Sequence, residues 1–102
     1  MAEYMFLMHG LTVPGATPGG PHADWGPYIA GLVEKGVMRG GSAMGRGECV
    51  RKSGDAPDIS RQISGYIKIE AADIEAAKAL LAGNPVYEAG GVVEIRELPV
   101  TG

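Results

Sequence analysis

The chain has 102 residues, 45% of them hydrophobic and 21% charged, which is typical of one globular domain and excludes a disordered or fibrous protein. A net charge of −3 argues against a surface for nucleic acid or anionic membranes. No apolar run approaches the roughly 18 residues of a membrane-spanning helix, and the start of the sequence lacks the basic residues of a signal peptide. The single cysteine, Cys49, excludes an intrachain disulfide. We therefore expect one cytoplasmic domain over residues 1–102, with no membrane or nucleic-acid partner.

The first third of the chain predicts a strand, a long loop and a helix. Residues 4–8 form an apolar run that is too short for a helix, which predicts a strand over residues 3–9. Residues 10–21 are rich in glycine and proline, which predicts a mobile loop that gates a pocket. Asp24 is the expected cap of the helix, and Gly36 is the expected end. The apolar stripe of this helix consists of Trp25, Tyr28, Ile29, Leu32 and Val33.

The middle of the chain predicts a hairpin followed by a further strand. Residues 37–44 and 48–52 have strand-like sequences on either side of a Gly-Arg-Gly turn at 45–47. Residues 63–70 alternate between apolar and polar side chains, which is the clearest strand pattern of the sequence.

The last third predicts a helix and a final strand. Asp73 is the expected helix cap, and the turn sequence Gly-Asn-Pro at 83–85 is the expected stop. The buried stripe of this helix consists of Ile74, Ala77, Leu80 and Leu81. Residues 92–98 form the last strand. The whole order is the split βαβ pattern of an α+β, ferredoxin-like sheet with an inserted hairpin and both helices on one face.

Three stretches of the sequence resemble the YCII-related family and its DGPF branch. They are EYMFLMHG at 3–10, WGPYIAGLVEKGVMRGG at 25–41, and a third stretch that runs from GYIKIEA at 65–71 through Asn84-Pro85 to GGVVEIRELP at 90–99. The resemblance implies a dimeric αβ-barrel, in which two ferredoxin-like sheets pack face to face with pockets between them.

An expectation of a homodimer also follows from the first strand. Alternation places Tyr4, Phe6 and Met8 on one face. If this face points away from the helices, it forms an exposed apolar patch, and a second copy of the sheet is the simplest cover.

The sequence departs from the family at two motifs. The Asp-Gly-Pro-Phe turn is reduced to Asp55-Ala56-Pro57. Counted back from Gly36, the position of the family's helical histidine holds Trp25, which the resemblance places near the pocket.

Two histidines are candidates for the site. His22 lies at the mouth of the glycine- and proline-rich loop, and is either a general base oriented by Asp55 or Asp58, or an exposed loop histidine. His9 ends the first strand, where it either lines the rim of the pocket or hydrogen-bonds the following loop.

Four polar side chains of the last two strands are expected to face the second sheet. They are Tyr66, Lys68, Glu94 and Arg96. Because burying unpaired charges is costly, these residues either form an ion-pair network across the dimer, or Lys68 and Arg96 hold an anionic ligand. We expect Arg96 to point into the inter-sheet space and to contact a carboxylate or a bound anion.

Two functions remain open from the sequence. The sequence has no metal-ligand spacing and no phosphate-binding glycine motif, so we expect neither a metal site nor a cofactor. The first function is a dimer that binds a small molecule, such as a small anion, between its sheets without catalysis. The alternative is a cofactor-free lyase or isomerase that uses His22 as a general base with an aspartate partner.

Overall fold

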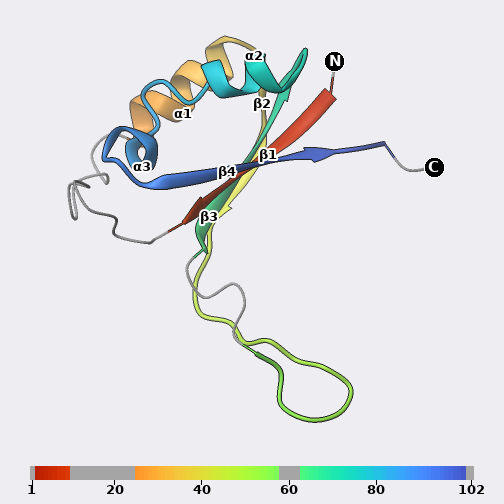
Figure 1. Cartoon of the computed structure of the whole chain (residues 1–102). Coiled ribbons are helices and arrows are strands. Elements are labelled where there is room, and N and C mark those ends of the chain that lie inside the picture. Colours follow the sequence, from red (N-terminus) through yellow and green to blue (C-terminus); the bar gives the residue numbers. More distant parts are fainter. Residues whose placement is uncertain (1, 10–24, 58–62, 101–102) are drawn as a thin grey trace.

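A computed structural model describes residues 2–9, 25–57 and 63–100 of the chain (Figure 1). Four strands form one antiparallel sheet, and the helices pack against one of its faces. The elements are β1 Ala2–His9, α1 Trp25–Glu34, β2 Met38–Ala43, β3 Ile63–Ala71, α2 Ile74–Ala79, α3 Pro85–Glu88 and β4 Val92–Leu98. None of the helices in these described ranges is long and apolar enough to cross a membrane.

The sheet has the strand order β2-β3-β1-β4. The first strand of the chain is therefore central, with β3 on one side and β4 on the other. Together with the helices between the strands, this order confirms the predicted α+β, ferredoxin-like architecture. The predicted pocket-gating loop at 10–21 lies outside the described residues.

The apolar core lies between the sheet and the helices. Phe6 and Ile69 are completely buried, and Leu32 of α1 is 1% exposed. Tyr4 and Met8 also belong to this core, so the expectation that they face a second sheet is wrong. The reason is the register of the sheet: Tyr4 lies opposite Ile69, and residues that lie directly opposite each other in an antiparallel pair share a face.

The face of the sheet opposite the helices, which we call the open face, carries the alternate side chains of each strand. On β1 these are Glu3, Met5, Leu7 and His9, all of which are partly buried. No other described element packs on this face. The strand is thus apolar on both sides, and only one side is covered by the core.

Helix α1 confirms the predicted helix from 25 onwards, whereas Asp24 lies outside the described residues. Gly36 ends it with φ of +73°, a left-handed conformation that glycine adopts without strain. The Gly36 amide donates to the Val33 carbonyl at 3.0 Å, and the next amide donates to the Leu32 carbonyl at 3.2 Å. Of the predicted stripe, Tyr28 and Leu32 are buried, but Val33 is 59% exposed.

Asp73 caps α2 as predicted, since its Oδ1 accepts a hydrogen bond from the Ala76 amide at 2.8 Å. Ile74 is 43% exposed and does not belong to the buried stripe, because the core contacts of α2 lie one turn later, at Ala77. α2 ends at Ala79 with Leu80 as its C-cap, so the predicted stop at the Gly-Asn-Pro sequence is wrong, and Leu80 and Leu81 lie outside the helix. Asn84 begins the short helix α3, and its Oδ1 accepts hydrogen bonds from the Val86 and Tyr87 amides.

The predicted strand at 48–52 is absent. Residues 44–57, which we call the 44–57 loop, contain neither helix nor strand and project away from the sheet (Figure 1). Val50, which the hairpin would have paired, is 83% exposed. The segment at 48–52 is short and rich in charged side chains. It buries too little apolar surface to form a two-stranded hairpin on its own.

Tyr28 links α1 to the end of α2 and gives the fold a predicted dependence on pH. Its hydroxyl donates to the Leu80 carbonyl at 2.8 Å, and burial raises the pKa of Tyr28 above its ordinary value of 10.0, an effect that the Asn84 side chain partly opposes. A raised pKa means that the folded protein favours the neutral phenol. The stability that Tyr28 adds to the fold is therefore fully present below pH 10.0, and it is lost as the pH rises through the pKa of the folded state.

We expect Tyr28→Phe to lower the free energy of unfolding by about 1 kcal/mol at neutral pH, because the hydrogen bond to Leu80 is lost. The variant should also lose less stability than the wild type when the pH is raised above 10.0. Urea denaturation at neutral and alkaline pH measures both effects. Parallel pH profiles for the two proteins would contradict the assignment.

Candidate functional site

The open face brings most of the predicted site residues together around β1. The sheet register places Met5 between Lys68 of β3 and Arg96 of β4. One step along the strand, Leu7 lies between Tyr66 and Glu94. Paired strands lie about 5 Å apart, so each row of three side chains spans about 10 Å. The two rows form an apolar centre with polar groups on both flanks.

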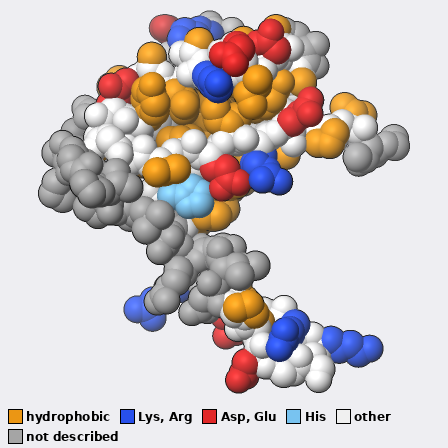
Figure 2. Space-filling model, viewed as in Figure 1, with side chains coloured by type: hydrophobic (Ala, Val, Ile, Leu, Met, Phe, Trp, Pro, Cys, Tyr) orange, Lys and Arg blue, Asp and Glu red, His pale blue; other side chains and the backbone are white. Residues whose placement is uncertain are grey.

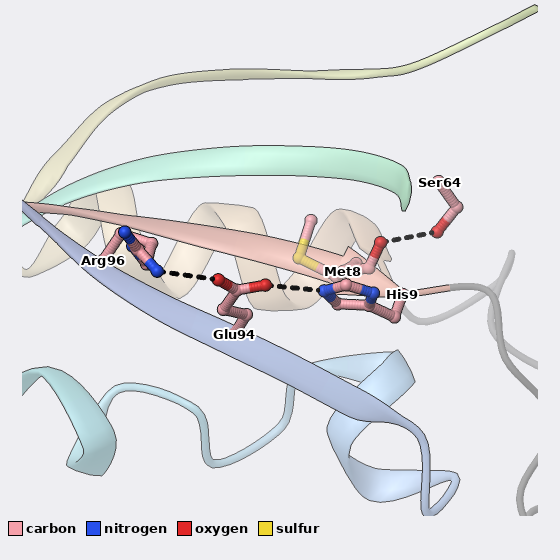
Figure 3. A network of polar contacts seen from close by, with 5 residues as sticks. All are labelled: Met8, His9, Ser64, Glu94 and Arg96. Carbon is pink, nitrogen blue, oxygen red and sulfur yellow. Dashed lines mark hydrogen bonds and ion pairs between the residues drawn. The ribbon is translucent and has the colours of Figure 1, made fainter. Parts of the chain in front are cut away.

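A chain of three polar side chains lies at the β4 side of this face (Figure 3). His9 Nε2 lies 2.9 Å from Glu94 Oε1, and Arg96 donates to the other carboxylate oxygen, Oε2, at 3.3 Å. The exposed fractions of the side chains rise along the chain, from 21% for His9 through 39% for Glu94 to 68% for Arg96. Figure 2 shows the same clustering of a histidine with an acidic and a basic side chain. We call these three residues the His9–Glu94–Arg96 chain.

The strands account for this arrangement. His9 lies opposite Val92, so Glu94 is its diagonal neighbour on the adjacent strand, within reach of a long side chain. Arg96 follows two residues later and therefore points to the same face of β4. At the same end of β1, the Ser64 hydroxyl donates to the Met8 carbonyl at 3.3 Å.

The contact with Glu94 favours one tautomer of His9. An ionised carboxylate can only accept hydrogen bonds, so beside ionised Glu94 we assign the proton of the imidazole to Nε2, which donates it to Oε1. In the neutral imidazole, Nδ1 then carries the lone pair. The pair is thus a histidine held in one tautomer by a carboxylate, and the carboxylate is itself held by a guanidinium.

The other flank of the open face is less constrained. Tyr66 and Lys68 are partly buried, and neither forms a side-chain hydrogen bond or ion pair with another described residue. Arg39 of β2 instead pairs with Glu70 at 3.1 Å. Lys68 and Arg96 therefore lie as cations on opposite sides of Met5, and of the two only Arg96 contacts a carboxylate within the described part of the chain.

Two further predicted site residues that the structure describes, Trp25 and Asp55, do not lie on this face. Trp25 packs beside the core with its ring edge-to-face against Tyr28, at a centroid distance of 6.1 Å. Asp55 is exposed in the 44–57 loop. His22 and Asp58 lie outside the described residues, so the pairing of His22 with an aspartate stays a prediction.

The contact between His9 and Glu94 was not predicted from the sequence, although each residue was a candidate. They are 85 positions apart, and no local spacing connects them. The available signal was topological: in a split βαβ sheet, the first and last strands are neighbours, so their same-face residues meet. Within the described ranges, no three histidine, cysteine or acidic side chains are grouped closely enough to hold a metal ion.

Comparison with known proteins agrees with this fold. The chain superimposes on 5-chloro-2-hydroxyhydroquinone dehydrochlorinase from Burkholderia phenoliruptrix, solved in complex with 2,5-dihydroxybenzoquinone, with a TM-score of 0.54. The two sequences are 13% identical, and the match covers 95% of this chain and 93% of the other, so the similarity is one of fold. No curated protein matches the sequence. The family model of the YCII-related domain matches residues 20–100, which is most of the chain, and the protein therefore belongs to the YCII-related domain family, as its motifs predicted.

Proposed function

We propose that the protein is a homodimer that binds a small organic anion between the open faces of its two sheets. The observation that carries the proposal is the placement of Lys68 and Arg96 on either side of Met5. Two cations beside an apolar floor fit a ligand with an acidic group and a flat or aliphatic body. We expect the dimer to act in the cytoplasm, since a single cysteine gives it no intrachain disulfide that would need an oxidising compartment.

The proposed dimer would cover the uncovered side of the central strand. Met5 and Leu7 lie at the middle of the open face, and charges of both signs surround them. In a two-fold symmetric contact the same patch meets itself, so a patch that carries both cations and carboxylates can form complementary pairs.

The proposed ligand site follows from the same geometry. Arg96 presents a planar fork suited to a carboxylate or another oxyanion, and Lys68 adds a point charge across Met5. The dehydrochlorinase with the similar fold was solved with a small oxygen-bearing ring compound, 2,5-dihydroxybenzoquinone, which supports a small ligand for this chain as well.

Sedimentation equilibrium at micromolar concentration tests the assembly. The expected mass is twice the 10.6 kDa of the chain, and a stable monomer would contradict the proposal. Leu7→Glu should shift the equilibrium toward monomer, because it places two carboxylates at the centre of a two-fold contact. Val33→Glu is the matched control, since Val33 is 59% exposed on α1 and away from the open face.

A thermal-shift series with aromatic and aliphatic carboxylates tests the ligand. A carboxylate at 100 times its Kd adds about 2.7 kcal/mol to the stability of the wild type. Arg96→Ala should abolish this gain while it lowers the stability without ligand by less than about 1 kcal/mol, because the Arg96–Glu94 pair is exposed. Arg46→Ala, in the 44–57 loop, removes the same charge and should keep the full gain. Equal responses of the two variants would count against a site at Arg96.

A further inference from the structure

We propose that His9 accepts a proton from a hydroxyl group of the bound anion, and that Glu94 is the positioning residue for this transfer. The inference rests on the proposed function, since the ligand must lie on the open face for His9 to reach it. It adds a ligand class: a small organic anion that also carries an enol or phenol hydroxyl.

The geometry of the His9–Glu94–Arg96 chain favours this role for His9. The 2.9 Å contact with Glu94 occupies Nε2, and no described residue forms a hydrogen bond with Nδ1. The lone pair of Nδ1 is therefore the basic end of the imidazole, with its tautomer set by the carboxylate behind it. Arg96 contacts the second carboxylate oxygen at 3.3 Å, so Glu94 has a partner on each side while its Oε1 faces the histidine.

The surroundings of His9 also suit proton transfer. Its side chain is 21% exposed, so it is partly withdrawn from water and still open to a ligand. Leu7, on the same face of β1, contributes apolar surface next to it. In such a setting a transferred proton is stabilised by the adjacent carboxylate with less screening than in water.

The step balances without a further reactant. The O–H bond of the ligand breaks, a new N–H bond forms at Nδ1 of His9, and the electron pair stays on the ligand oxygen. The imidazolium then faces the Glu94 carboxylate, and the new oxyanion lies on the face that carries the Arg96 and Lys68 cations.

A purely structural role for the same contact makes a different prediction. A cross-strand pair that only joins β1 to β4 would contribute a fraction of a kcal/mol to stability and would leave the protonation of a ligand unchanged. The experiment must therefore report on protons rather than on stability.

The probe is 4-hydroxy-3-nitrobenzoate, whose phenol changes its visible absorbance when it loses its proton, and its matched analogue is 3-nitrobenzoate, which lacks the hydroxyl. At a pH below the phenol's own pKa, the probe bound to the wild-type dimer should be more ionised than the free probe. His9→Gln and Glu94→Gln should both return it to the ionisation of the free probe. Glu75→Gln, which removes an exposed carboxylate from α2, is the control and should behave as the wild type.

Nitrogen-15 NMR of the labelled imidazole gives a second readout. The wild type should show the His9 proton on Nε2, with the signal assigned by its loss in His9→Gln. Glu94→Gln should change this tautomer preference, and Glu75→Gln should leave it unchanged.

The outcomes separate the two proposals. If the hydroxylated probe binds but its ionisation is the same in the wild type and in His9→Gln, the proton-acceptor role is overturned and the binding function stands. If only 3-nitrobenzoate binds, the hydroxyl-bearing ligand class is overturned. If neither compound nor any carboxylate of the thermal-shift series binds the wild type, the proposed function itself fails.

Discussion

Replacing Phe6 with alanine should lower the free energy of unfolding by about 3–5 kcal/mol. Phe6 is completely buried at the middle of the central strand, opposite Ile67 on one side and Ile95 on the other. Alanine leaves a cavity that the strands cannot close, because both neighbours are held by the hydrogen bonds of the sheet. A domain of this size has a total stability of about 5–15 kcal/mol, so the loss is a large share of it.

Urea denaturation followed by circular dichroism measures this effect, with an unchanged slope expected if the unfolded state is not altered. Val50→Ala is the control, because Val50 is 83% exposed in the 44–57 loop and should change the stability by less than about 0.5 kcal/mol. Similar losses for the two variants would refute the placement of the core between the sheet and the helices.

The second large effect is expected at Asn84, where alanine should cost about 2–3 kcal/mol. Its side chain is completely buried, and its Oδ1 accepts from two backbone amides, Val86 at 3.0 Å and Tyr87 at 3.1 Å. Alanine removes the cap of α3 and leaves these amides without their acceptor at a position where the side chain itself is shielded from water.

Asp73→Ala is the matched comparison, because it removes the cap of α2 at an exposed position where water can replace the acceptor. It should cost about 1 kcal/mol, less than Asn84→Ala. Hydrogen exchange at the Val86 and Tyr87 amides should accelerate only in the Asn84 variant. If Asn84→Ala lowers the free energy of unfolding no more than Asp73→Ala does, burial of the capping side chain does not increase its contribution to stability.

Sequence patterns identified the strands best where one face is apolar and the other polar. Residues 63–70 alternate strictly, and the structure places Ile67 and Ile69 in the core as expected. The first strand has no such contrast, since Phe6 and Leu7 are both apolar. The register with the neighbouring strands decides which face of β1 points to the helices. The sequence of a single strand contains no information about this register.

In the candidate site, too, the face of each side chain could be predicted from the sequence, whereas contacts between strands could not. The face of Glu94 and Arg96 followed from the alternation along β4. The contact of Glu94 with His9 depends on which strands are neighbours, and this is a property of the whole chain. The short helix α3 was missed because the Gly-Asn-Pro sequence was interpreted as the stop of α2, whereas asparagine followed by proline is also typical of a helix start.

The central position of β1 has a consequence for the synthesis of the protein. Both strands that pair with β1 are made after it, and the nearer of them begins only at Ile63. At a translation rate of about 5–20 residues per second, Tyr4, Phe6 and Met8 wait about 3–11 seconds for β3, and longer for β4. During this interval the nascent chain presents an unpaired apolar strand, the kind of segment that chaperones bind and that aggregates when it is left alone. The folding yield in the cell should therefore depend more on the first nine residues than their share of the chain would suggest.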